Sequence, residues 1–184
     1  LGNKVLENFP VKQLIKYIDW TFFFHQWDIP GRYPKIFDDP VKGKEAKKLF
    51  DEAQTMIEKI ISKNMLQANG VFGFYPAYSK HDSISILDIN GKDIVAEFNF
   101  IRNQRIKNEN EPNLCLSDFI IPESENRKDY IGLFAVTAGL GAEKWVKQFK
   151  DEGNDYDAIM LKILADRLAE AFAEMLHEKV RKEY

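Results

Sequence analysis

The last thirty residues carry the pattern that most constrains the fold. Apolar side chains recur there every three or four residues, the spacing of one face of an α-helix: Leu161, Leu164, Leu168, Phe172 and Met175. Asn154 or Asp155 can cap this helix, which is predicted to run to the end of the chain. Because 45% of the 184 residues are hydrophobic and 13% are aromatic, the chain can bury a sizeable core.

The rest of the chain alternates between helical and strand patterns. Residues 43–63 predict a second helix with apolar positions at helical spacing: Ala46, Leu49, Phe50, Ala53, Ile57, Ile60 and Ile61. Strands are predicted at residues 71–77, 83–89, 94–100 and 130–137, with Asn90-Gly91 as a hairpin turn. Residues 102–112 predict a loop or frayed helix, and a short helix is expected at about 142–150. The predicted fold is α+β, with a mainly antiparallel twisted sheet flanked by helices and a long C-terminal helix.

Residues 1–40 form an aromatic segment broken by four prolines. The prolines argue against one long helix. We therefore expect irregular structure that wraps over the rest of a single domain, residues 1–184, with its aromatic side chains as anchors.

Composition excludes several classes of protein. The 26 basic and 29 acidic side chains give a net charge of −3, which argues against a dedicated nucleic-acid binder. A single cysteine, Cys115, excludes an internal disulfide framework and a cysteine-only zinc site; its apolar setting predicts a buried structural thiol in a reducing compartment. No apolar run approaches the roughly 20 residues that span a bilayer. The start is not a signal peptide, and without an initiating Met we expect a piece of a longer protein.

Four carboxylates are candidate binding residues. Asp166, Glu170 and Glu174 follow one another at intervals of four residues on the polar side of the last helix. They form either a solvated face, compensated by Lys162 and Arg167, or a face that receives a cation. Asp19, which precedes Trp20, is either a cap or turn residue or an anionic anchor for a cationic ligand in an aromatic-lined cleft.

The remaining motifs do not build a catalytic site. Thr137–Gly141 lies between a predicted strand and a predicted helix, but it lacks the Walker pattern and the Gly-x-Gly-x-x-Gly pattern. Its glycines serve either a tight turn or close approach of the backbone to a ligand. His25, His81 and His177 have no metal-ligand spacing, and no Gly-x-Ser-x-Gly motif is present. These residues alone predict a soluble α+β domain without a catalytic site of its own.

Several segments together resemble the activation domain of cobalamin-dependent methionine synthase. The Asp-Trp-Thr-x-Phe-Phe motif at Asp19 and the helix Ala165–Glu174 are the most specific of them. The matches follow the family's order and cover nearly the whole chain: Ile18–Phe24, Gly31–Ile36, Gly70–Ala77, Leu116–Phe119, Asp129–Thr137, Ala165–Glu174 and Leu176–Arg181.

This resemblance implies a reactivation module of a cytoplasmic, modular methyltransferase. In the family, the enzyme methylates homocysteine from methyltetrahydrofolate, with cobalamin as the carrier. The activation domain binds S-adenosylmethionine (AdoMet) and supports the reductive methylation of oxidised cobalamin. Its expected partners are the cobalamin-binding domain of the same protein and a flavodoxin-like reductase, with no nucleic acid and no membrane. Cobalamin and any zinc are expected in other modules, and the fragment alone is not expected to be catalytic.

The resemblance also carries roles to three residues. Asp19 and Glu170 occupy the positions of family residues that contact AdoMet. A carboxylate is a natural partner for the ammonium and sulfonium of that ligand. Asp166 matches the family residue expected to face the cobalamin-binding domain, so it is predicted to serve interdomain docking.

The sequence departs from the family at two places. The family continues through a Trp-Gly-Tyr segment and an Arg-Pro-x-x-Gly-Tyr motif, whereas this chain stops at Tyr184, so we expect an incomplete domain with half of the AdoMet site. Ala138 stands where the family often has glycine, and alanine tolerates positive φ poorly. The alternative function is a docking module for a cobalamin domain or reductase that does not itself bind AdoMet. An independent AdoMet-dependent methyltransferase is disfavoured because no glycine-rich Rossmann loop is present.

Overall fold

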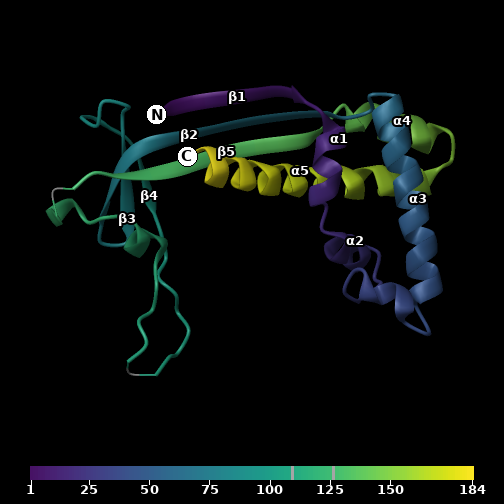
Figure 1. Ribbon diagram of the computed structural model, residues 1–184, viewed down its shortest axis with the longest axis horizontal. Coiled ribbons are helices and arrows are strands. Elements are labelled where there is room, and N and C mark those ends of the chain that lie inside the picture. The colour runs from purple at the N-terminus through teal and green to yellow at the C-terminus, as the bar shows by residue number, and fades with distance from the viewer. Residues whose placement is uncertain (109, 126) are drawn as a thin grey trace. The chain divides into compact units, whose positions relative to one another are not determined.

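The computed structural model describes residues 1–108, 110–125 and 127–184 and has the predicted α+β architecture (Figure 1). Its strands are β1 (Gly2–Phe9), β2 (Gln67–Lys80), β3 (Ser83–Leu87), β4 (Ile94–Asn99) and β5 (Asp129–Leu140). They form a five-stranded sheet in the order β1-β2-β3-β4, and β5 also pairs with β2. The α-helices are α1 (Val11–Leu14), α2 (Trp20–Gln26), α3 (Gly43–Ser62), α4 (Ala142–Asp151) and α5 (Asp155–Glu183). Short 3₁₀ turns are η1 (Ile15–Tyr17), η2 (Lys35–Asp38), η3 (Leu116–Phe119) and η4 (Glu123–Glu125).

The chain divides into two compact units. The first comprises Leu1–Val5 and Val71–Phe134, and the second comprises Leu6–Gly70 and Ala135–Tyr184. All five α-helices belong to the second unit. Among the described residues, no helix combines the length and the apolar character that crossing a bilayer requires.

The first unit is built around the predicted hairpin. β3 pairs antiparallel with both β2 and β4, and Ile84 and Ile86 are 2% exposed on its buried face. In the connecting turn the Asp88 carboxylate accepts a hydrogen bond from the Lys92 amide at 2.7 Å, and Gly91 has φ +71°. The alternating apolar pattern and the Asn-Gly turn therefore predicted this hairpin correctly.

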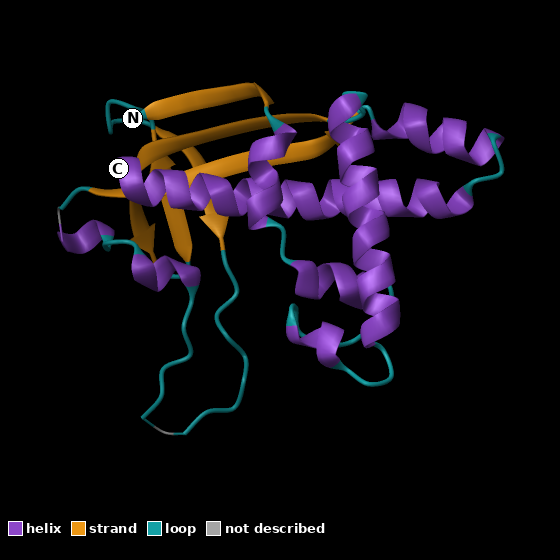
Figure 2. Cartoon of the chain, turned by 45° about the vertical axis from the view of Figure 1, so that its right-hand side comes forward, coloured by secondary structure: helices purple, strands orange, loops and turns teal. Residues whose placement is uncertain are grey.

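Arg102 organises the long connection that follows β4. Figure 2 shows most of this connection as a loop, which is one of the two predictions for residues 102–112; residue 109 of that range lies outside the described residues. The Arg102 guanidinium donates to Asp118 at 2.6 and 2.8 Å and to Asp82 at 2.7 Å. The guanidinium of Arg102 lowers the pKa of Asp118 to about 2, with further help from the Cys115 amide. Cys115 is 3% exposed, which confirms the prediction of a buried thiol.

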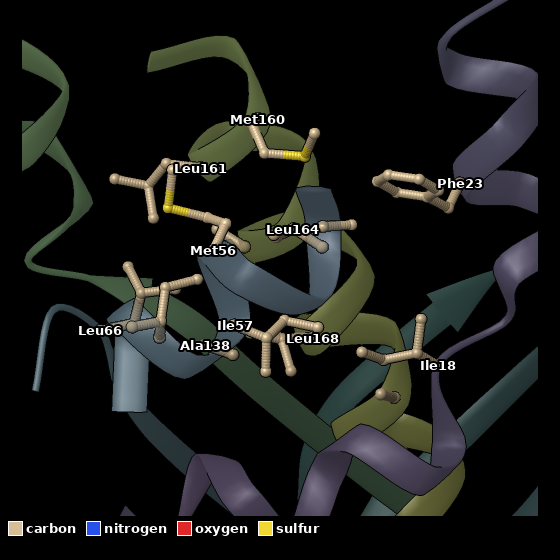
Figure 3. Packing of buried hydrophobic residues seen from close by; sticks show 14 of the residues in the cluster. Ile18, Phe23, Met56, Ile57, Leu66, Ala138, Met160, Leu161, Leu164 and Leu168 are labelled. Carbon is tan, nitrogen blue, oxygen red and sulfur yellow. The ribbon is translucent and has the colours of Figure 1, made fainter. Parts of the chain in front are cut away.

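The second unit packs around α5. The Asn154 side chain accepts a hydrogen bond from the Asp157 amide at 3.1 Å, which confirms the predicted cap. The predicted apolar face of α5 is buried, and α5 contacts α1, α2, α3 and α4. Figure 3 shows part of the core, which includes side chains from α2, α3 and α5: Phe23, Met56, Ile57, Met160, Leu161, Leu164 and Leu168. The helical periods of α3 and α5 therefore predicted the main packing surface of this unit.

The segment Thr137–Gly141 differs from the prediction in its first part. β5 continues to Leu140, so Ala138 and Gly139 belong to the strand rather than to a turn that leaves it. Ala138 is fully buried and is not among the residues with positive φ, which removes the objection to alanine at this position. Gly141 makes the turn: it has φ +92° and is the N-cap of α4.

Gly141→Ala is expected to destabilise the protein by about 1–3 kcal/mol, because alanine is strained in the left-handed region. An added Cβ would also lie 3.0 Å from the Met65 carbonyl oxygen. Gly139→Ala is the matched control, because its added Cβ would meet only the Ala165 Cβ, at 3.7 Å. Urea unfolding of both variants checks the prediction, and equal losses of free energy would contradict it.

The N-terminal segment is more regular than predicted. Residues 2–9 form β1, and Trp20–Gln26 form α2, so the prediction of irregular structure over residues 1–40 is wrong for these parts. β1 has no fully buried residue. Its sequence therefore lacks the alternation that reveals a half-buried strand, and backbone pairing with β2 defines it instead.

Candidate functional site

Asp19 is the N-cap of α2. Its carboxylate accepts a hydrogen bond from the Thr21 amide at 2.8 Å, and the residue itself is exposed. The capping interpretation of Asp19 is therefore confirmed. A carboxylate offers about four acceptor positions, so a cap that uses one of them leaves the others for a ligand.

Aromatic packing fixes the backbone on both sides of Asp19. Ile18 and Trp20 are buried, with 7% and 8% exposure. The Trp20 ring lies edge-on to Phe50, with ring centroids 4.6 Å apart. Tyr33 stacks on Phe50 at 5.7 Å, and its amide donates to the Thr21 hydroxyl at 3.2 Å. The predicted role of the aromatic segment as an anchor is confirmed, and Asp19 is thereby held at a defined point on the surface.

The polar side of α5 carries the other candidate residues. Asp166, Glu170 and Glu174 are all exposed, as their spacing predicts. Arg167 is different: it is 8% exposed and donates two hydrogen bonds to Glu170, Nη1 to Oε2 and Nη2 to Oε1, each at 2.8 Å. The expected charge compensation by Arg167 is therefore confirmed. Of the three carboxylates, Glu170 is the one that Arg167 binds.

The fold brings the Asp19 segment to α5 although 151 positions separate Asp19 from Glu170. Both η1 and α2, which flank Asp19, contact α5. Ile18 and Leu168 belong to the same buried core (Figure 3). Each carboxylate has its own protein partner, the Thr21 amide for Asp19 and Arg167 for Glu170.

A side-chain hydrogen bond that sequence reasoning missed ties these elements together. The Tyr17 hydroxyl donates to Glu178, two turns beyond Glu170 on α5. Glu178 also pairs with Lys182, and hydrogen bonds from Lys182 and Tyr17 lower the pKa of Glu178 to about 2. Because Tyr17 and Glu178 are 161 positions apart, no local sequence pattern predicts this hydrogen bond.

Asp166 lies on a groove between α4 and α5. The groove has a volume of about 600 Å³, and Gly139, Val146 and Ala165 contribute its apolar surface. Lys150 and Lys162 line it together with Asp166. Asp166 is exposed on this groove and forms no ion pair with another described residue.

The segment Thr137–Gly141 has a structural role. Gly139 lies in β5 and packs against Ala165, while Gly141 makes a turn, so the turn interpretation of this segment is confirmed for Gly141. In the described ranges, no group of three or more His, Cys, Asp or Glu side chains is placed to hold a metal ion.

Two comparisons with known proteins relate this chain to a family. The family model described as the vitamin B12 dependent methionine synthase activation domain matches residues 10–184. The crystal structure of the MetH reactivation domain bound to AdoHcy matches with a TM-score of 0.92 and 43% sequence identity. This match covers 100% of the present chain and 56% of the solved one, so the chain spans little more than half the length of that relative.

Proposed function

Because the chain belongs to the family of vitamin B12-dependent methionine synthase activation domains, we propose that it is an AdoMet-binding module for reductive reactivation of the enzyme. The observation that carries this proposal is the whole-chain match, at 43% identity, to a reactivation domain bound to AdoHcy. The parent enzyme would transfer a methyl group from methyltetrahydrofolate to homocysteine in the cytoplasm.

The carboxylates of the candidate site fit this ligand. AdoHcy, the product of methyl transfer from AdoMet, lacks the sulfonium charge but keeps the α-ammonium of its amino-acid part. Exposed carboxylates at Asp19 and Glu170 are suitable acceptors for that ammonium, and α5 contacts the two elements that flank Asp19. We assign AdoMet binding to these two residues.

The domain's contribution to chemistry is position and charge. Cobalamin, held by another module, would supply the nucleophile that accepts the methyl group of AdoMet. No side chain of this chain is required as a general acid or base. Asp19 and Glu170 orient the ligand so that its methyl group is presented to the partner module.

Asp166 is proposed as a docking residue toward the cobalamin-binding domain. Its support is its exposure, its place beside the groove between α4 and α5, and its lack of an ion-pair partner in the described part of the chain. A flavodoxin-like reductase is the proposed electron donor. Cobalamin and any zinc are proposed to be held by other modules of the parent protein.

Calorimetric titration of AdoMet into two forms of the protein tests the function. One form is the 184-residue chain, and the other is extended through the C-terminal segment that the family carries (the extended form). We expect the extended form to bind AdoMet and the shorter chain to bind it more weakly. If neither form binds AdoMet but Asp166→Asn weakens association with a cobalamin-loaded domain, docking alone would be the better account.

A further inference from the structure

Arg167 is buried, unlike the acidic side chains Asp166 and Glu170 beside it on α5. Its side chain is 9% exposed, whereas that of its partner Glu170 is 63% exposed. The two hydrogen bonds to Glu170 are both 2.8 Å long, and the buried Nε has no acceptor among the described residues. The guanidinium is therefore held inside the protein and has one carboxylate as its charged partner.

The pairing with Arg167 fixes the orientation of the Glu170 carboxylate but leaves some of its hydrogen-bond acceptor positions unused. Each terminal nitrogen of Arg167 donates to a different oxygen, so the plane of the carboxylate is fixed by two points. Each oxygen keeps a second acceptor position that Arg167 does not use. Because Glu170 is largely exposed, a ligand can reach these positions without displacing the guanidinium.

We propose that Arg167 is a positioning residue of the AdoMet site. It holds the Glu170 carboxylate from the buried side, so that the unused acceptor positions of the carboxylate can bind the α-ammonium of the ligand. This inference rests on the proposed function. Lysine cannot replace arginine here, because a single ammonium group lacks the planar fork that binds both oxygens at once. The role is indirect, since Arg167 acts through Glu170 and does not itself touch the ligand.

Binding of three ligands to Arg167→Lys tests the role in both forms of the protein. AdoMet carries an ammonium and a sulfonium, AdoHcy carries only the ammonium, and 5′-methylthioadenosine carries neither. We expect Arg167→Lys to weaken AdoMet and AdoHcy binding by about tenfold and to change 5′-methylthioadenosine binding by less than about twofold. Equal weakening of all three ligands would assign Arg167 a purely structural role and overturn the proposal, as would unchanged affinity for all three.

Two further variants make the result specific. Arg181→Lys is the matched control, because Arg181 lies exposed on the same helix, and it should leave all three affinities unchanged. In a Glu170→Gln background, Arg167→Lys should weaken AdoHcy binding by less than about twofold more, because the substitution acts through the carboxylate. A full additional tenfold loss in that background would contradict the mechanism. A wild-type extended form that binds 5′-methylthioadenosine but neither AdoMet nor AdoHcy, or none of the three, would refute the proposed function itself and Arg167's role with it.

Discussion

Phe172→Ala is expected to lower the free energy of unfolding by about 3–5 kcal/mol, a large share of the stability of a typical domain. Phe172 belongs to α5, and its side chain is fully buried. It stacks on Phe9, with ring centroids 4.9 Å apart. It also packs closely against Gly70, where a Cβ would lie 3.0 Å from the Phe172 ring. Truncation would therefore leave a cavity beside Phe9 and Gly70. Urea unfolding followed by circular dichroism measures the loss.

Phe22→Ala is the control for this experiment. Phe22 is 54% exposed on α2, so the same change of side chain removes little buried surface. We expect it to lower the free energy of unfolding by less than about 1 kcal/mol. Similar losses for Phe22→Ala and Phe172→Ala would contradict the description of the core around α5.

Asp19→Asn and Glu170→Gln should each weaken AdoMet binding by about tenfold to a hundredfold, since each removes an anionic acceptor from an ammonium ligand. Glutamine is chosen at position 170 because alanine would leave the buried Arg167 without an acceptor and unsettle α5. The two losses should multiply in the double variant if both carboxylates contact the ligand independently. Calorimetry on the extended form measures all three affinities.

Glu174→Gln separates a specific site from a general acidic surface. Glu174 lies one turn beyond Glu170, is exposed and has the same charge. The Glu174→Gln variant should bind AdoMet as tightly as the wild-type protein does. Equal weakening by Glu174→Gln and Glu170→Gln would indicate that net negative charge on α5, rather than two placed carboxylates, attracts the ligand.

The two longest helices were predictable from the sequence because their burial is periodic. Apolar residues at helical spacing marked α3 and α5, and Asn154 marked the start of α5. The hairpin of β3 and β4 was predictable because apolar residues alternate along β3, where Ile84 and Ile86 are buried, and an Asn-Gly turn joins its strands. In each case apolar residues repeat in the sequence with the period of the element.

Contacts between segments far apart in the sequence could not be predicted from local patterns. β1 is defined by its pairing with β2, and the Tyr17–Glu178 hydrogen bond joins residues 161 positions apart. Asp19 illustrates a different limit: the structure confirms it as a cap, and that role is compatible with ligand binding. Local pattern alone left both interpretations of Asp19 open, and the family resemblance supplied the functional one.

Arg167 lies between these cases. The sequence offered it, together with Lys162, as a compensating partner for the acidic residues of a solvated face, and the structure pairs it with Glu170, its neighbour three positions along the helix. Its burial was not predictable, since an arginine between acidic residues normally lies in solvent. Arg167 is buried because α5 packs against the rest of its unit. The inference that Arg167 holds Glu170 in place depends on this burial.

A crystal structure of the extended form with AdoHcy would show whether Asp19 and Glu170 bind the ligand. We expect the ligand's α-ammonium to lie within hydrogen-bond distance of the Asp19 and Glu170 carboxylates, with Arg167 still paired to Glu170. Ligand bound elsewhere, for example in the groove between α4 and α5, with both carboxylates unengaged, would contradict it.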